Sequence, residues 1–443
     1  MQTVSYKAYL NLAIPFTLST VTQPLLGAVD TAVVGRLDSP SFIGGVAIGT
    51  VIFNTLYWLF GFLRVATSGF AAQSLGENRQ EDLAYAWLRP LLISAAIGLL
   101  FLLCQRFILN GAMGLYNADP SVAVHAVSYF KILIWGAPFV LIGYVNLGWL
   151  MGRGHVGEVL LLQVGTNVLN ILLDILFVVC LNLGVAGVAW ATLIAQAAGF
   201  FLGLWLIFRR LPPVFLLSHL HGAFDARAMK KMAMVNSDLF IRTACLLTMT
   251  NIFVARGSGM GADILAANAI LFQIQYLIAY LFDGLANAAS VLGGKCAGAK
   301  DLSEFTKLRS IAHTNLVGLG LLLIVGLAML GDPLLALFTD IEPILVICRH
   351  YLFYLMLFVV AMAPGLVYAG FYIGATCSAP IRNSLILALA LFLPVEFLLI
   401  PHFQNHGLWA AFIAFCAMRS LVLFFSWDRI MEDNYSPVEA ESC

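Results

Sequence analysis

The sequence has 443 residues, of which 61% are hydrophobic and 10% are charged. Soluble globular domains carry about 25% charged residues, so this composition excludes an ordinary soluble enzyme. Lys plus Arg (23) balances Asp plus Glu (23), and the basic excess of a nucleic-acid-binding protein is missing. We therefore expect a membrane protein whose partner is the lipid bilayer and not nucleic acid.

Apolar stretches long enough to cross a bilayer recur along the whole chain. A spanning helix needs about 20 mostly apolar residues, and the stretches lack the alternation of a β-barrel strand. The pattern predicts an all-α polytopic membrane protein with twelve transmembrane helices. They are expected at residues 10–34, 43–66, 88–109, 124–148, 157–181, 185–208, 232–255, 264–288, 311–330, 346–372, 382–400 and 407–427.

The Lys and Arg residues of the loops indicate the orientation of these spans. With the N-terminus inside, most of them fall on the cytoplasmic side, and only Arg36, Arg106 and Arg256 fall outside. Cationic residues in short loops mark the cytoplasmic side. Because the number of spans is even, both termini are expected in the cytoplasm.

An internal repeat with an offset of 222 residues relates the two halves. It pairs Gly148 with Gly370 and Asp174 with Glu396, and it also superimposes the loops and the span ends. Two six-helix lobes of parallel topology follow, and a cavity between such lobes can open alternately to either side. The expected parts are an N-terminal lobe (1–208), a cytoplasmic linker (209–231), a C-terminal lobe (232–427) and a polar, disordered cytoplasmic tail (428–443).

Ionisable side chains inside spans cost about 2.5 to 3.5 kcal/mol each to insert, so each is a candidate for function. In the second lobe, Asp238 and Arg242 are four residues apart and can neutralise each other on one helix face. Arg419 can pair with Glu396 or Asp283 across helices. These five residues are interpreted as a charge network that ties the second lobe together.

The first lobe holds two buried carboxylates, Asp30 and Asp174. The only Lys or Arg residues in its outer half are Arg36 and Arg106, at the rim. A low dielectric without a cation favours the neutral form of a carboxylate, so we expect this pair to take up and release protons. Pro15 lies in the same span as Asp30 and is expected to kink it.

Polar neighbours support this interpretation. Asn170 lies one turn before Asp174, Thr192 follows at comparable depth in the next span, and Asn146 of the fourth span is a further candidate. The alternative is that the aspartates only bond to these amides and hydroxyls as structural contacts between helices.

Other patterns carry no function in this interpretation. His219 with His221, and His402 with His406, have metal-like spacings but lie in loops beside Pro without Cys or carboxylate neighbours. They are interpreted as solvated loop histidines, so no metal site is predicted. No trio of nucleophile, base and orienting group stands out, so no enzyme activity is expected.

Four motifs resemble those of the multidrug and toxic compound extrusion (MATE) family, and the first of them is similar to its DNA-damage-inducible (DinF) subfamily. They are PLLGAVDTAVVGRLDSP (24–40), AAQSLG (71–76), NVLNILLD (167–174) and GVAGVAWAT (184–192). The resemblance covers nearly the whole chain. It implies a cation-coupled antiporter of a bacterial cytoplasmic (inner) membrane that exports amphipathic, often cationic organic compounds.

The resemblance also implies roles for single residues. Asp30 becomes the coupling and substrate-linked carboxylate, and Pro15 becomes the kink of the same helix. Asp174, Asn170 and Thr192 match the polar network of the N-terminal lobe, and Asn146 matches it less closely. One branch of the family has a carboxylate in the middle of span 10, where this sequence has Met-Ala-Pro-Gly (362–365), so coupling through the first lobe is favoured.

The sequence thus predicts a secondary active multidrug efflux transporter that works by alternating access. It is expected to exchange its substrate for protons, with sodium as the alternative coupling ion, to need no cofactor and to work as a monomer. A lipid-linked sugar flippase of related fold stays open as an alternative. The pyrophosphate headgroup of its substrate would require more Arg and Lys residues in the cavity than the spans contain. An intramembrane enzyme is the third possibility.

Overall fold

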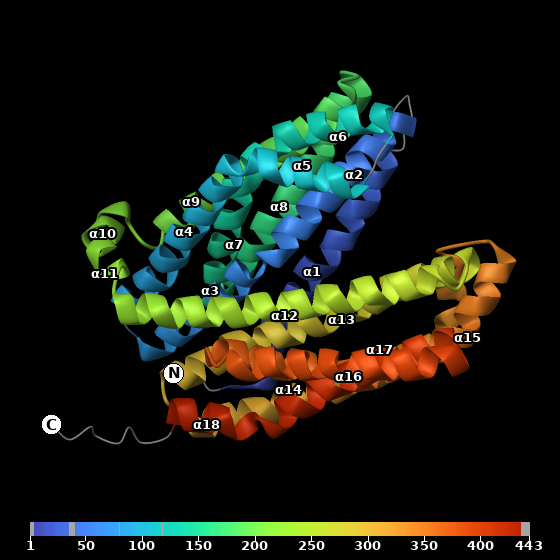
Figure 1. The fold of residues 1–443 in the computed structure, drawn as a ribbon. Helices are drawn as coiled ribbons and strands as arrows, with labels where there is room; N and C mark the ends of the chain where they lie inside the picture. Colours follow the sequence, from blue (N-terminus) through green and yellow to red (C-terminus); the bar gives the residue numbers. More distant parts are fainter. Residues whose placement is uncertain (1–3, 35–39, 79, 117–118, 436–443) are drawn as a thin grey trace. The chain divides into compact units, whose positions relative to one another are not determined.

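The computed structural model describes residues 4–34, 40–78, 80–116 and 119–435 (Figure 1). This part of the chain is helical and contains no strand. In the first half the helices are α1 (Tyr6–Val34), α2 (Pro40–Leu59), α3 (Phe62–Glu77), α4 (Gln80–Leu103), α5 (Gln105–Tyr116), α6 (Pro120–Leu133), η1 (Ile134–Gly136), α7 (Ala137–Gly152), α8 (Val156–Asp174), η2 (Ile175–Cys180) and α9 (Gly184–Phe208). The second half has α10 (Pro213–Ser218), α11 (Leu220–Ala223), α12 (Ala226–Ser258), α13 (Ala262–Gly298), α14 (Leu302–Ala336), α15 (Glu342–Gly374), α16 (Ala379–Phe403), α17 (Asn405–Phe425) and α18 (Trp427–Tyr435).

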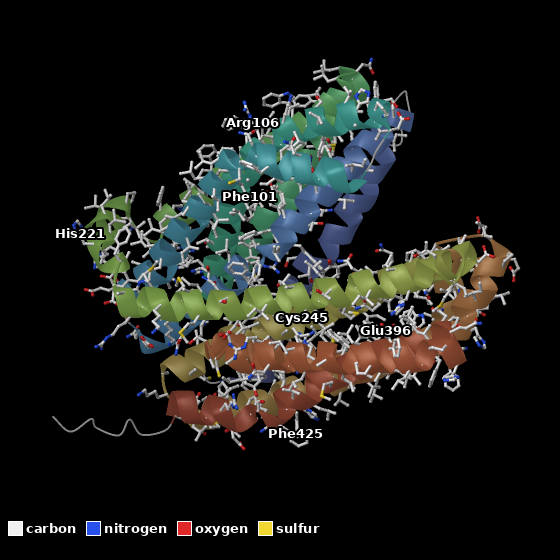
Figure 2. All side chains as sticks on the ribbon, in the orientation of Figure 1. Phe101, Arg106, His221, Cys245, Glu396 and Phe425 are labelled. Carbon is white, nitrogen blue, oxygen red and sulfur yellow. The ribbon has the colours of Figure 1, made fainter. Side chains whose placement is uncertain are left out.

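Eleven helical segments of the described chain are long and apolar enough to cross a membrane. With α1 they make twelve, so the expected all-α fold of twelve transmembrane helices is confirmed. Large apolar side chains lie exposed on these helices. One example is Phe425 at the end of α17, whose side chain points away from the ribbon (Figure 2). Such faces suit a hydrocarbon solvent, in which helices satisfy every backbone hydrogen bond internally.

Two of the predicted spans are broken helices. The span expected at 43–66 is α2 followed by α3, with a break at Phe60 and Gly61. The span expected at 124–148 is α6, a short 3₁₀ turn and α7. Pro138 explains the second break, because its ring nitrogen cannot donate to the carbonyl of Ile134, which instead accepts from Ala137.

The described chain divides into two compact units. One contains residues up to Thr20, Gly76–Asn78 and the chain from Met234 on; the other contains Val21–Leu75 and the chain from 80 to Ala233. The first half of α1 packs on α13, where the Tyr9 hydroxyl donates to the carbonyl of Leu285 at 2.8 Å. The lobe boundaries expected at 208 and 232 stay a prediction.

The backbone repeats with the offset found in the sequence. A positive φ is rare outside glycine, and positions with a positive φ recur here 222 residues apart. The pairs are Asn78 (55°) with Lys300 (54°), Gly154 (73°) with Thr376 (54°), and Asn182 (51°) with Gln404 (49°). Each half therefore ends its helices in the same backbone conformation.

Close helix contacts repeat in the same way. A Cβ atom added to Gly148 of α7 would meet the carbonyl oxygen of Arg64 on α3, and one added to Gly370 of α15 would meet that of Ala286 on α13. Residues 64 and 286 are themselves one repeat apart. Glycine at these positions lets two backbones approach closely, and the internal repeat predicted from the sequence is present in the packing.

The end of the chain differs from the expectation. Residues 427–435 form helix α18 instead of a disordered tail. Trp427 stacks on Phe305 of α14 with ring centroids 5.5 Å apart, and the guanidinium of Arg309 lies 4.3 Å from the centre of the Trp427 ring. These aromatic contacts hold a segment whose polar composition alone indicated disorder.

Candidate functional site

Helix α8 carries a buried carboxylate and amide one turn apart. The Nδ2 group of Asn170 donates to Oδ2 of Asp174 at 3.0 Å. Asp174 is 1% exposed and Asn170 is 6% exposed. The spacing of four residues places both side chains on one helix face, so this part of the predicted site is formed as expected.

The helix changes its geometry immediately after this pair. Residues Ile175–Cys180 form a π-helical turn, and the amide of Leu181 donates to the carbonyl of Leu176 five residues earlier at 3.0 Å. Single π-turns within α-helices are rare and are often found at functional sites. Asp174 is thus the last residue of a regular helix, at a point where the backbone departs from regular geometry.

The same face of α8 packs against α9. A Cβ atom on Gly199 of α9 would meet the hydroxyl of Thr166 on α8, which fixes the register of the two antiparallel helices. Two turns outward along each helix, Asp174 and Thr192 stand at the same depth. The Thr192 hydroxyl donates to the carbonyl of Val188 at 3.0 Å and does not bond to Asp174. Thr192 therefore lies at the depth of Asp174, as expected, and its hydroxyl donates to the backbone of its own helix.

Two further polar residues of α8 and α9 were not predicted from the sequence. Thr166 lies one turn before Asn170, and Gln196 lies one turn after Thr192. The Oε1 atom of Gln196 is buried and has no hydrogen-bond partner among the described residues, and it lies against Gly136 of the 3₁₀ turn. The recurrence of polar residues at every fourth position was the signal that would have found both.

Asn146 does not join this group. It is fully buried on α7, where its Oδ1 accepts from the indole nitrogen of Trp87 at 2.9 Å and its side chain packs on Gly203 of α9. Gly203 is eleven residues further along α9 than Thr192, a separation of about 16 Å along a helix. Asn146 thus belongs to a contact of α4, α7 and α9 near the other end of the lobe.

Asp30 and Pro15 both lie in α1. The backbone of Asp30 is helical, but its side chain lies outside the described residues. The helix runs from Tyr6 to Val34 through Pro15 without interruption. Beyond Pro15, the hydroxyl of Thr20 donates to the carbonyl of Tyr280 at 3.1 Å and joins α1 to α13.

Asp238 has a different partner from the one expected. The guanidinium of Arg382 donates to its Oδ1 at 2.7 Å, and the hydroxyl of Ser378 donates to its Oδ2 at 2.6 Å. The expected neutralisation by Arg242 one turn away is wrong. The contact with Arg382 joins α12 to the start of α16, and spacing along one helix could not reveal it.

Glu396 of α16, which is labelled in Figure 2, likewise pairs with a residue outside the predicted set. Arg256, in the last turn of α12, donates to its Oε1 at 2.9 Å, and Glu396 is 4% exposed. The expected pairing with Arg419 is therefore wrong for this carboxylate. Glu396 is the repeat equivalent of Asp174, so the two lobes place a carboxylate at the same position, where Asp174 accepts from the neutral amide of Asn170 and Glu396 accepts from the guanidinium of Arg256.

Arg419 is buried within the second lobe. It is 1% exposed, its Nη1 donates to the sulfur of Met362 at 3.5 Å, and the charges of Arg242 and Asp283 act on it. The alternative expectation, that Asp283 compensates Arg419, agrees with this arrangement. Met362 belongs to the Met-Ala-Pro-Gly stretch (362–365) of α15 that was compared with the family.

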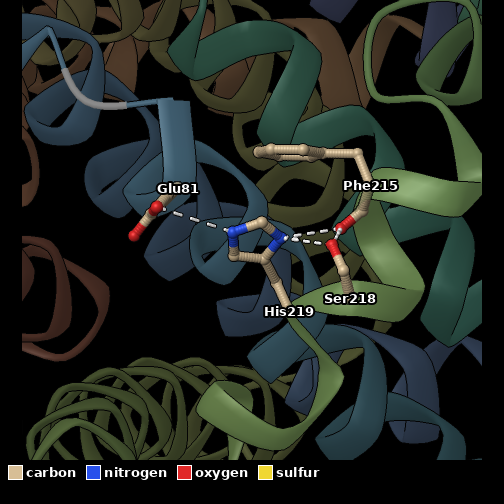
Figure 3. Close-up of polar contacts among 4 residues, drawn as sticks. All are labelled: Glu81, Phe215, Ser218 and His219. Carbon is tan, nitrogen blue, oxygen red and sulfur yellow. Dashed lines mark hydrogen bonds and ion pairs between the residues drawn. The ribbon is translucent and has the colours of Figure 1, made fainter.

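His219 is not a solvated loop residue (Figure 3). Its Nδ1 contacts the carbonyl of Phe215 at 2.7 Å and the hydroxyl of Ser218 at 3.0 Å. Its Nε2 lies 3.7 Å from a carboxylate oxygen of Glu81 at the start of α4. The ring therefore fastens the linker helix α10 to α4, which corrects the interpretation made from the spacing of the histidines.

One family model matches the chain twice. The model named MatE covers residues 15–176 and 239–398, and these two ranges are related by nearly the same 222-residue offset. Together they cover more than half of the chain. The chain belongs to the MatE family.

Relatives in this family share most of the chain. DNA damage-inducible protein F of Escherichia coli K12 is 33% identical over 432 residues, which cover 96% of this chain and 93% of the relative. The probable multidrug resistance protein NorM of Bacillus licheniformis is 21% identical and covers 96% of this chain and 95% of its own length.

Solved MATE structures share the fold. A MOP superfamily transporter from Pyrococcus furiosus is 20% identical, with 97% of this chain and 96% of that chain covered at a TM-score of 0.85. A MATE protein in a bent conformation is 19% identical, with 96% of both chains covered at a TM-score of 0.87. This MatE chain is accordingly a multi-pass membrane transporter of the multidrug efflux type and not an enzyme.

Proposed function

We propose that the chain exports amphipathic or cationic organic compounds across a cytoplasmic membrane in exchange for protons, with both termini in the cytoplasm. The exchange proceeds by alternating access in a single copy of the chain. Sodium is the alternative coupling ion, because carboxylate, amide and hydroxyl oxygens also suit a hard cation. The names of relatives such as NorM and MdtK, which are called multidrug resistance proteins, support the substrate class.

The observation that carries the proton assignment is the buried contact between Asn170 and Asp174. A carboxamide offers both N–H donors and a carbonyl acceptor. The amide can donate to the ionised carboxylate, and after rotation it can accept from the protonated acid. This partner therefore stabilises Asp174 in either protonation state, as a reversible proton site requires.

The equivalent carboxylate of the second lobe has the opposite character. The guanidinium of Arg256 carries only donors, so it stabilises Glu396 in the ionised form. A proton arriving at Glu396 would break the ion pair at 2.9 Å. We therefore assign proton exchange to the first lobe and a structural role to Glu396.

Antiport follows from competition in the first lobe. Organic cations bind while Asp174 and Asp30 are ionised, and protonation from outside removes the charge that holds the substrate. In a one-for-one exchange of a proton for a monovalent organic cation, no net charge crosses the membrane, so the pH gradient supplies the driving force. One pH unit corresponds to about 1.4 kcal/mol per proton, which sustains about a tenfold concentration ratio of the substrate.

Transport in reconstituted vesicles tests this function. Proteoliposomes loaded with ethidium are given either a pH gradient or a sodium gradient, and efflux is followed for the native chain, Asp174→Asn and the control Glu396→Gln. We expect the pH gradient alone to drive efflux, Asp174→Asn to lose at least 90% of it, and Glu396→Gln to keep its dependence on the pH gradient. Efflux driven by sodium alone would contradict proton coupling, and efflux driven by neither would favour the flippase.

A further inference from the structure

Two histidines from different helices meet at one end of the second lobe. The Nε2 atom of His350, in the third turn of α15, lies 2.9 Å from the Nε2 atom of His406 at the start of α17. His350 is exposed and His406 is half-buried. The two ring planes are inclined at 73°. The two Nε2 atoms, each a nitrogen that can ligate a metal ion, therefore face each other at hydrogen-bond distance.

We propose that His350 and His406 form a binding site for a divalent transition metal ion, of the class that prefers imidazole ligands. Metal–nitrogen bonds to histidine are about 2.0 to 2.1 Å long. Two such bonds at a right angle place the nitrogens about 2.9 Å apart, whereas a tetrahedral angle would place them about 3.4 Å apart. The observed separation fits neighbouring corners of a tetragonal site, which is the preference of Cu²⁺ and Ni²⁺.

The other ring nitrogen of His406 has the partner that a metal ligand needs. Its Nδ1 lies 3.2 Å from the hydroxyl oxygen of Tyr354, one turn after His350 on α15. Ligating histidines nearly always donate their second N–H to such an acceptor, and this contact fixes the tautomer. With the proton on Nδ1, the lone pair of Nε2 is directed toward His350.

Buried contacts hold the start of α17 in place. The amide groups of Asn405 and Asn268 exchange two hydrogen bonds of 2.8 and 3.0 Å, and the indole of Trp409 donates to the same Asn268 oxygen at 2.9 Å. His406 lies between these anchored residues on α17. A site whose supporting residues are already fixed loses little entropy when it binds its ion.

The two imidazoles are the protein ligands of this site. No group of three or more His, Cys, Asp or Glu side chains that could hold a metal occurs in the described part of the chain. Water therefore completes the coordination, which is possible because His350 faces the outside of the protein. Nearby Arg349 is paired with Asp332 at 3.0 Å and with Glu342 at 3.3 Å, so its charge is compensated and does not repel the ion.

Metal binding to the purified full-length chain, prepared without a polyhistidine tag, tests the proposal. Ni²⁺ is titrated by calorimetry, and the Cu²⁺ complex is examined by electron paramagnetic resonance. We expect one site that binds Cu²⁺ more tightly than Ni²⁺, with hyperfine coupling from two imidazole nitrogens. Tyr354→Phe should weaken binding by about tenfold, because it removes the supporting contact but leaves both ligands.

Substitutions of single histidines separate this site from the others in the chain. His350→Gln and His406→Gln should each abolish the site, and His402→Gln should retain it as a matched control, because His402 is also exposed at the end of α16. The melting temperature without metal should be similar in all three, and added Ni²⁺ should raise it only for His402→Gln and the native chain. Equal Ni²⁺ binding by the native chain and by His350→Gln, or coupling to a single nitrogen, would overturn the proposal.

Discussion

Asp174 and Glu396 occupy equivalent positions of the repeat and accept hydrogen bonds from donors of different chemistry. Asn170 donates a neutral amide hydrogen to Asp174 at 3.0 Å, and Arg256 donates a cationic one to Glu396 at 2.9 Å. At the scale of single residues, this difference is the basis on which we propose proton exchange at Asp174 and a structural role for Glu396. It arises in two helices that the repeat relates.

The ion pair of the second lobe should contribute to stability. Glu396 is 4% exposed, and its Oε2 atom has no hydrogen-bond partner within the described ranges. Arg256→Met would leave this carboxylate buried without its cation, which we expect to cost about 2 to 3 kcal/mol. The double variant Arg256→Met with Glu396→Met should recover most of this loss, because no buried charge remains.

Unfolding in mixed detergent micelles measures the free energy of unfolding of both variants. A double variant that is less stable than the native chain by the sum of the losses of the two single variants would show that the two residues do not interact. The same experiment includes Glu396→Met alone, which completes the double-mutant cycle.

Single residues also show how far the sequence alone could go. Asn170 and Asp174 are one helical turn apart, so their contact could be predicted from spacing. Arg256 and Glu396 are 140 residues apart, and their contact follows from the way in which α12 and α16 pack. Spacing rules report only neighbours on one helix, and the expected pair of Asp238 with Arg242 failed for this reason.

At the scale of helices, glycines set how closely the spans approach. Gly148 and Gly370 each pack against a backbone carbonyl of a neighbouring helix, and Gly143 of α7 has open space where a Cβ atom would be. The same close contact between a glycine and a neighbouring backbone thus occurs in both halves of the chain. Its position was readable from the sequence as paired glycines, although the contacts themselves were not.

Alanine substitutions test this packing. We expect Gly148→Ala and Gly370→Ala to lower the free energy of unfolding by about 1 to 3 kcal/mol each, because a methyl group forces two helices apart. Gly143→Ala should instead be neutral or stabilising by about 0.5 to 1 kcal/mol, since alanine favours the helix and meets no neighbour. Thermal unfolding in detergent provides the measurement, and equal effects at the three positions would contradict the packing argument.

Helix geometry also marks the limit of prediction. The π-turn after Asp174 leaves no signal in an apolar sequence such as Ile-Leu-Phe-Val-Val-Cys (175–180), because every side chain there suits an ordinary helix. The break before α7 did have a signal in the sequence, Pro138. A hydropathy pattern does not detect it, because the apolar stretch continues on both sides of the proline. Regular spans were therefore placed well, and the irregular turns that shape the site were not.

At the scale of the whole molecule, the repeat organises both the fold and the function. Paired positive φ angles, paired glycine contacts and a family model that matches each half agree on one offset. The sequence was sufficient to find this organisation, because a repeat leaves the same apolar and turn pattern twice. The division of roles that we propose for the halves depends on partners far apart in the chain, such as Arg256 and Glu396, and these contacts required the structure.

Proton release on substrate binding is the most direct test of proton exchange at Asp174 in the first lobe. Ethidium is added to the purified chain in a weakly buffered detergent solution, binding is followed by fluorescence and released protons by a pH-sensitive dye. We expect the native chain to release protons when it binds ethidium. Asp174→Asn should release at least one proton fewer, and Glu396→Gln should release as many as the native chain. Binding without proton release in the native chain, or unchanged release in Asp174→Asn, would contradict proton exchange in the first lobe.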